Sequence, residues 1–201
     1  TASVFSVGTD NSVNASGGTY VAYVFAGGES TAANARSVDF DGTGDHLVPL
    51  ASDDFEVGTG DFTIECWIKK SNVTEYRGIF QLSTSNTGLS TNSTSSIALA
   101  YDGYYHDRWE LYANGSQHNI SLGGHITQGE WYHVAVVRQS GTTSFYVNGI
   151  KKTSFSDTTN YFYQCLGIGG FYSTSYLWSG SISNFRFVKG TAVYTSSFRP
   201  P

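Results

Sequence analysis

Two runs of β-forming residues flank a short polar turn in the segment 129–152, which reads GEWYHVAVVRQSGTTSFYVNGIKK. The first run is rich in Val and aromatic residues, the second contains Phe145, Tyr146 and Val147, and an Asn-Gly pair follows directly. Such side chains fit a pleated sheet, and Asn-Gly is a strong turn signal. The segment therefore predicts an antiparallel hairpin, around which the rest of the fold has to be built.

Strand patterns recur along the chain, whereas no window shows an apolar stripe at helical spacing. Segment 62–69 alternates strictly, with Phe62, Ile64, Cys66 and Ile68 on one side and Thr63, Glu65, Trp67 and Lys69 on the other. This alternation predicts a strand with one buried face and one wet face. The expected strands are 19–25, 37–40, 46–49, 62–69, 78–82, 95–101, 108–113, 118–121, 131–139, 143–147, 166–169 and 179–187.

Many short strands separated by Gly, Asn, Asp and Ser predict an all-β fold, an antiparallel two-sheet β-sandwich or jelly roll. The 201 residues suit one domain with a sizeable core. We expect four parts: an N-terminal β segment at 1–26, a small polar linker at 27–35, a main body at 36–198 and the start of a C-terminal linker at 199–201. The N-terminal segment either packs on the main body or is the end of an upstream domain. Because the chain begins at Thr1 and contains no Met, a larger parent protein is expected.

Charge and the length of the apolar segments argue against two classes of partner. The net charge is −5, and no run of Lys or Arg exceeds two residues, so binding to a nucleic acid backbone is not expected. No apolar segment approaches the roughly 20 residues that a membrane-spanning helix needs, so membrane insertion is not expected either.

The two cysteines, Cys66 and Cys165, are too few and too far apart for a disulfide framework or a zinc site. Each lies in an apolar, strand-like run. Two small buried hydrophobic residues are the favoured interpretation, and a single bridge is the alternative.

An ordered set of motifs resembles the concanavalin A-like, laminin G-like jelly-roll family over roughly residues 36–198. The motifs are SVDFDGTGDHLVPL, DFTIECWIKK, GIF, the hairpin above, LGIGG and SGSISNFRFVKGTAVYT. The pattern of an aromatic pair, HVA and a closing V-N-G is matched by Trp131, His133, Val134, Ala135, Val147, Asn148 and Gly149. The resemblance implies that Trp131, Val134, Val136 and Val147 fill the core, with an aromatic ligand platform as the alternative role of Trp131. Packing is also expected for Trp67, Trp109, Trp178 and His133.

Both ends of the chain are similar to modules of phage structural proteins, especially tail fibre and appendage proteins. The carrying stretches are FSVGTDNSVNASGGTYVAYVFAGG at the start and KGTAVYTSSFRPP at the end. This resemblance implies a location on the virion surface, contacts with other virion subunits and assembly as a homo-oligomer. A secreted or extracellular bacterial protein is the alternative.

Catalysis is not expected. Glucanases of this fold carry paired acids on one strand, whereas the six glutamates here form no such cluster. The segment 39–45, DFDGTGD, offers Asp39, Asp41 and Asp45 as oxygen ligands for calcium, which some family members bind. The competing interpretation is that these acids cap a turn through backbone amides.

The most suggestive loop is 101–112, YDGYYHDRWELY, where Tyr104, Tyr105, His106 and Arg108 combine flat rings with polar groups. Tyr172 and Tyr176 offer similar rings in the segment 169–180. Sugars stack on such rings and form hydrogen bonds with such polar groups, so these six residues are the candidate carbohydrate-binding residues. An ordinary tyrosine-rich surface, or a contact with another subunit, is the alternative.

The expected function is therefore a non-catalytic virion module that attaches to a host surface glycan. Two alternatives stay open: a purely structural decoration or assembly domain of a virion, and a carbohydrate-binding or adhesin domain of a secreted bacterial protein.

Overall fold

The computed structural model describes residues 37–72, 74–84, 89, 97–121, 126–172 and 174–201. All of them belong to the second of the two units into which the chain divides, Arg36–Pro201. The expected N-terminal β segment 1–26, its strand at 19–25 and the linker 27–35 lie outside the described residues.

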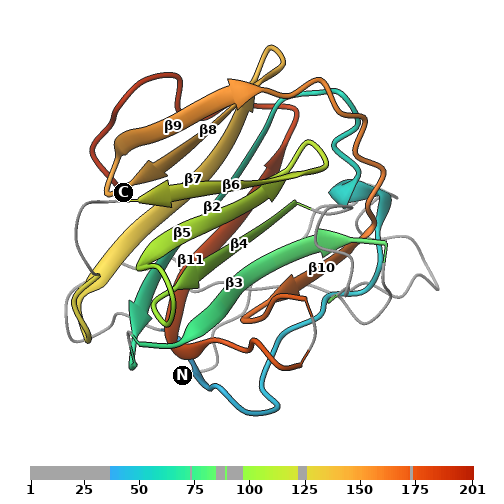
Figure 1. The fold of residues 1–201 in the computed structure, drawn as a ribbon. Coiled ribbons are helices and arrows are strands. Elements are labelled where there is room, and N and C mark those ends of the chain that lie inside the picture. Colours follow the sequence, from blue (N-terminus) through green and yellow to red (C-terminus); the bar gives the residue numbers. More distant parts are fainter. Residues whose placement is uncertain (1–36, 73, 85–88, 90–96, 122–125, 173) are drawn as a thin grey trace, which may run out of the picture. The chain divides into compact units, whose positions relative to one another are not determined.

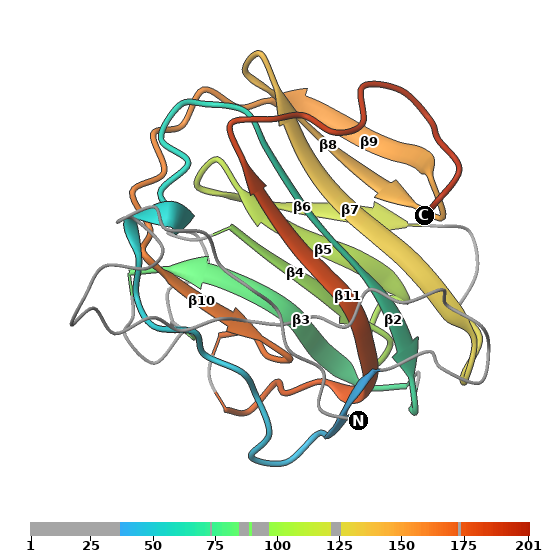
Figure 2. The same ribbon diagram turned by 180° about the vertical axis from the view of Figure 1, so that it is seen from behind.

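Two antiparallel sheets face each other, as predicted, in a jelly-roll sandwich (Figures 1 and 2). The six-stranded sheet has the order β1 (Val38–Asp41), β11 (Ser179–Lys189), β2 (Phe62–Lys70), β7 (Trp131–Gln139), β8 (Thr142–Val147) and β9 (Ile150–Ser156). The five-stranded sheet has the order β10 (Cys165–Ile168), β3 (Tyr76–Ser83), β4 (Ile97–Asp102), β5 (Arg108–Ala113) and β6 (Ser116–Ser121). The helical content of the described residues is one short 3-10 turn, Asp53–Phe55, and none of their helices is long enough to cross a membrane.

The core lies between the inner faces of the two sheets. The apolar set predicted from the alternation of β2, including Phe62, Ile64 and Ile68, is fully buried there. It meets Leu99 and Trp109 of the opposite sheet. Cys66 and Cys165 are both buried and free, as the favoured interpretation predicted, and burial raises the pKa of each thiol.

The predicted hairpin is β7 and β8, with Val134 opposite Val147 and Gln139 opposite Thr142. It lies inside the six-stranded sheet, because β7 also pairs with β2 and β8 with β9. Strand β9 was not predicted, since its sequence, IKKTSFS, is polar and mostly exposed at the sheet edge. The segment predicted at 46–49 forms only an isolated bridge between Leu47 and Ile168.

The tryptophans divide between core and surface. Trp109 and Trp178 are fully buried, as expected, but Trp131 is 38% exposed, so its predicted place in the core is wrong. Val134 and Val136 occupy the inward positions of β7, and Trp131 opens the strand on the opposite, outward register. There it lies under the ammonium of Lys69.

The predicted wet face of β2 is also largely wrong, because Thr63 and Glu65 are buried. Residues 190–200, here called the C-terminal strap, cross the outer face of the six-stranded sheet beside β7 and β8 (Figure 2). The strap places Ala192, Tyr194 and Phe198 against apolar outward side chains of the sheet.

Polar contacts hold the strap as well. The hydroxyl of Thr63 donates to the carbonyl of Thr191 at 3.0 Å and accepts from the amide of Val193 at 2.9 Å. The buried Glu65 carboxylate pairs with Arg186 and with Nε2 of the buried His133, at 3.2 Å for the latter. Burial alone would raise the pKa of Glu65, but its bonds with His133 and Tyr194 and the charge of Arg186 hold that pKa below its usual value.

Candidate functional site

Two loops far apart in sequence meet at one end of the five-stranded sheet. The first connects β4 to β5 and presents Tyr104 and Tyr105, and the second lies between β10 and β11 and presents Tyr176. Together with the start of β3 they enclose an open groove of about 260 Å³, here called the tyrosine groove. Its lining residues are Glu75, Tyr76, Arg77, Tyr104, Tyr105, Ser175 and Tyr176.

The rings of Tyr104 and Tyr105 are the most accessible part of the groove. They are 67% and 74% exposed, and their centroids lie 4.4 Å apart in an edge-to-face arrangement. Burying such rings against the C–H face of a sugar removes apolar surface from water on both partners.

The buried carboxylate of Asp102 fixes the backbone that carries this pair. It accepts the amides of Tyr104 and Tyr105 at 3.2 and 2.9 Å and bonds to Nδ1 of His106 at 2.6 Å. Burial would raise the pKa of Asp102, but these bonds outweigh it and lower the pKa below its usual value. His106 is therefore tied to the loop through one ring nitrogen, while the imidazole stays half exposed.

Arg108 does not project freely towards solvent. Its Nε and Nη2 donate to one oxygen of the buried Glu110 at 3.0 and 2.7 Å. The second Glu110 oxygen accepts the hydroxyls of Tyr76 and Tyr112, each at 2.9 Å. This network forms the floor beneath the groove, and burial together with these bonds raises the pKa of Tyr76.

The second loop reaches the groove because β3 contains a glycine at the contact. A Cβ on Gly78 would overlap Phe171, which stacks on Tyr112 with centroids 4.7 Å apart. Tyr172 follows in a left-handed conformation, with φ of 67°, and its amide donates to Gln81 at 3.1 Å. The Tyr172 ring lies 6.0 Å from that of Tyr176, at the side of the groove.

The six candidate carbohydrate-binding residues thus fall into three groups. Tyr104, Tyr105 and Tyr176 line the groove itself, Tyr172 and His106 lie next to lining residues, and Arg108 is part of the floor. Three lining residues were not predicted from the sequence: Glu75, Tyr76 and Arg77, from β3 and the residue before it. Arg77 bonds to Glu75 at 2.9 Å and to the carbonyl of Ser175 at 3.3 Å, so it bridges the two sides. The sequence signal for these residues was the segment EYRG, in which two charged residues and an aromatic ring directly precede the strand predicted at 78–82.

The predicted calcium ligands are not brought together. Asp39 bonds to the hydroxyl of Ser181 on β11, and Asp41 accepts the amide of Thr43 at 2.6 Å, which is the turn-capping role. Within the described ranges, the group whose ligand atoms lie within 4.8 Å of one another is Asp102, His106 and Glu110. These three could offer a mixed nitrogen and oxygen set to a cation, although both carboxylates already accept the bonds described above.

Solved structures with this fold come from varied proteins. Domain 4 of an extracellular GH43 arabinanase from Geobacillus stearothermophilus, in complex with arabinotriose, is 14% identical at a TM-score of 0.58, covering 78% of this chain and 72% of that chain. A heptameric SAP-like pentraxin from Limulus polyphemus is 20% identical at 0.56, covering 75% and 74%. Domains LG4-5 of the mouse laminin α1 chain are 15% identical at 0.57, covering 81% and 47%. At these identities the likeness is one of fold alone.

No curated protein matches the chain. The laminin G-type model of the concanavalin A-like lectin/glucanases superfamily matches residues 41–192, which include strands of both sheets and both loops of the tyrosine groove. The chain belongs to the concanavalin A-like lectin/glucanases superfamily.

Proposed function

We propose that this chain is a non-catalytic glycan-binding module and that the tyrosine groove is its binding site. The observation that carries the proposal is the exposure of Tyr104 and Tyr105 at a groove that also presents Glu75 and Arg77. Exposed rings supply stacking surfaces, and the charged pair supplies donors and acceptors for sugar hydroxyls. The same division of roles is typical of small polar ligands that bind in open grooves.

The groove suits binding better than hydrolysis. A glycosidase uses two carboxyl groups about 5–10 Å apart across the scissile bond. Here the Glu75 carboxylate is bonded to Arg77, and Glu110 lies beneath the groove with both oxygens occupied by donors. Both acids therefore position their neighbours.

The setting that we propose is the surface of a virion, in a tail fibre or another appendage, where the module attaches to a host glycan. This part rests on the resemblance of the stretch KGTAVYTSSFRPP to phage-type modules. The arabinanase domain with bound arabinotriose supports glycan binding in general, since it has the same fold.

A glycan array probed with the whole 201-residue chain and with Tyr104→Ala/Tyr105→Ala tests the groove. The exposed rings contribute little to the core, so the variant should fold normally while losing roughly tenfold or more in affinity. Phe162→Ala is the matched control, because Phe162 is 61% exposed but belongs to a different loop.

Three results would bear on the proposal. Binding that survives in the tyrosine variant would place the site elsewhere, and a wild-type chain that binds no glycan would favour a contact between virion subunits. Binding that is lost with a chelator would indicate a cation requirement, for which Asp102, His106 and Glu110 are the clustered candidate ligands.

A further inference from the structure

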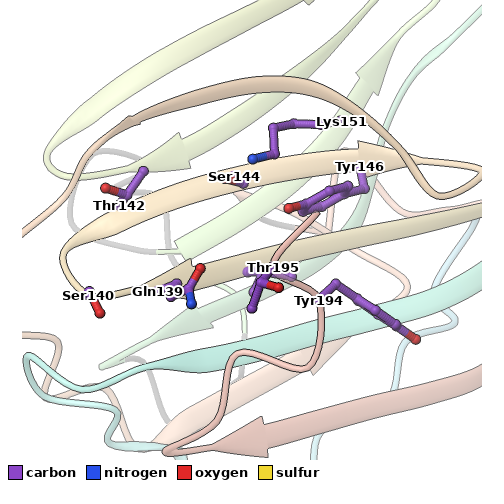
Figure 3. A pocket seen from close by; sticks show the side chains of 9 residues that line it. Gln139, Ser140, Thr142, Ser144, Tyr146, Lys151, Tyr194 and Thr195 are labelled. Carbon is purple, nitrogen blue, oxygen red and sulfur yellow. The ribbon is translucent and has the colours of Figure 1, made fainter. Parts of the chain in front are cut away.

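A second cavity lies on the other sheet. It is enclosed between the outward face of the β7–β8 hairpin and the C-terminal strap, and its volume is about 410 Å³ (Figure 3). Here it is called the strap pocket. Its lining residues come from β7, the turn after it, β8, β9 and the strap.

Hydroxyl and amide groups dominate the lining. Gln139, Ser140, Thr142, Ser144 and Thr195 contribute them, and within the part of the chain that the structure describes none of these side chains bonds to another protein group. Ser144 lines the pocket although it is only 7% exposed. Five side chains with unused hydrogen-bonding capacity in one hollow suit a ligand with many hydroxyls.

Lys151 gives the pocket a positive charge. Its ammonium lies 5.7 Å from the ring centroid of Tyr146, and in the described structure it has no carboxylate partner. No Asp or Glu belongs to the lining, although the chain carries 16 acidic side chains against 11 basic ones. The pocket is thus a local exception to the negative charge of the molecule, and a carboxylate in it would meet a cation without a competing acid.

Two aromatic side chains form the apolar walls. Tyr146 is buried beneath Lys151, and Tyr194 turns its hydroxyl away from the pocket to accept from Arg186 at 3.3 Å (Figure 3). Tyr194 also stacks on Phe198, with centroids 3.4 Å apart. Phe198 in turn packs on Tyr146 of β8, with centroids 5.4 Å apart, so the strap is fixed to the sheet and the pocket is preformed rather than assembled on binding.

We infer that the strap pocket binds a single carboxylate-bearing sugar residue of an acidic saccharide. Lys151 pairs with the carboxylate, the Ser, Thr and Gln side chains bond to the hydroxyls, and the partly exposed ring of Tyr194 faces the apolar side of the sugar. One cation among five neutral hydrogen-bonding groups fits one carboxylate on a polyhydroxylated ring better than a doubly charged phosphate. This site is separate from the tyrosine groove and does not depend on it.

The test is isothermal titration of the whole chain with a uronic-acid disaccharide and with its carboxyl-reduced, neutral counterpart. We expect the acidic disaccharide to bind, and the reduced one to bind roughly tenfold or more weakly, since a hydrogen bond to a charged group is lost. Lys151→Gln should show the same loss for the acidic ligand.

Matched variants separate this site from general charge effects and from the groove. Lys152→Gln makes the same change of charge at the next residue, which does not line the pocket, and it should bind like the wild type. Ser144→Val removes one of the lining hydroxyls and should weaken binding of the acidic disaccharide, while thermal unfolding reports whether the variant still folds. Tyr104→Ala/Tyr105→Ala should leave the acidic disaccharide bound.

Each contrary outcome overturns a defined part of the inference. Equal affinity for the acidic and the reduced disaccharide would remove the role of Lys151. Competition by acetate alone at similar concentrations would reduce the pocket to an anion site without sugar recognition. Loss of binding in the tyrosine variant, with Lys151→Gln unaffected, would assign the acidic ligand to the groove instead.

Discussion

The guanidinium of Arg138 is fully buried at the end of β7, where loops from distant parts of the chain converge. It donates to the carbonyls of Gly58, Gly60 and Thr159 and lies 4.0 Å from the carboxylate of Asp157. Arg138→Met keeps most of the volume but leaves these acceptors without their cation, so we expect it to lower the free energy of unfolding by about 3–5 kcal/mol. Urea titration measures this. Lys152→Met, at an exposed position, should change it by less than about 0.5 kcal/mol, and a comparable loss there would contradict the assignment.

Lys70 is a second buried cation, with its ammonium bonded to the carbonyls of Asn72 and Glu75. Burial lowers its pKa from 10.5 to about 8. Between these two values the unfolded chain holds the proton that the folded chain has released, so raising the pH favours the folded state. Relative to Lys70→Met, the wild type should gain stability between pH 8 and 10.5, by at most about 1.4 kcal/mol per pH unit. Unfolding curves across this range measure the difference, and a flat difference would show that Lys70 titrates normally.

Among the elements, the C-terminal strap depends on close approach to the turn between β8 and β9. The amide of Phe198 donates to the carbonyl of Gly149 at 2.9 Å, and a Cβ on Gly149 would overlap the Phe198 carbonyl. Gly149→Ala should therefore displace the strap, lower stability by about 1–3 kcal/mol and speed hydrogen exchange at residues 192–198. Gly115→Ala is the control, since Gly115 also has a positive φ, of 64°, but nothing lies within 4 Å of its Cβ. Equal effects of the two substitutions would mean that backbone strain alone is responsible.

The elements also show which features a sequence can predict. Strands with an apolar alternating face, such as β2 and β7, were predicted within a residue of their ends, because one periodicity determines both their conformation and their buried face. Strand β9 has no such face, and its strand conformation is fixed by its pairing with β8 at the sheet edge. The burial of Glu65 was not predictable from β2 alone, since the strap that covers it begins more than 100 positions later.

At the scale of the whole molecule, each sheet has a segment packed against side chains outside the main core: Phe171 packs on Ala98, Ala100 and Tyr112 of the five-stranded sheet, and the C-terminal strap packs on the six-stranded sheet. The strap helps to line the strap pocket, and the loop that carries Phe171 helps to line the tyrosine groove. The sequence was sufficient to predict that Tyr104 and Tyr105 lie together, because they are adjacent in one loop. It could not predict Glu75 and Arg77, which reach the groove only through the pairing of β3 with β4. The strap pocket was not predicted for the same reason, since Lys151 and Thr195 meet only in the folded chain.

Because the two sites lie on different sheets and share no lining residue, they should bind independently. Changes at separated sites without shared partners add to within about 0.3–0.5 kcal/mol. Lys151→Gln should therefore leave the affinity of the groove for a neutral glycan unchanged, and adding it to Tyr104→Ala/Tyr105→Ala should remove both activities without a further loss of stability. Titrations of the single and combined variants with both ligands complete this cycle. A coupling above about 1 kcal/mol would contradict independence and would mean that a single extended saccharide spans the two faces, or that the strap and the tyrosine loops move together.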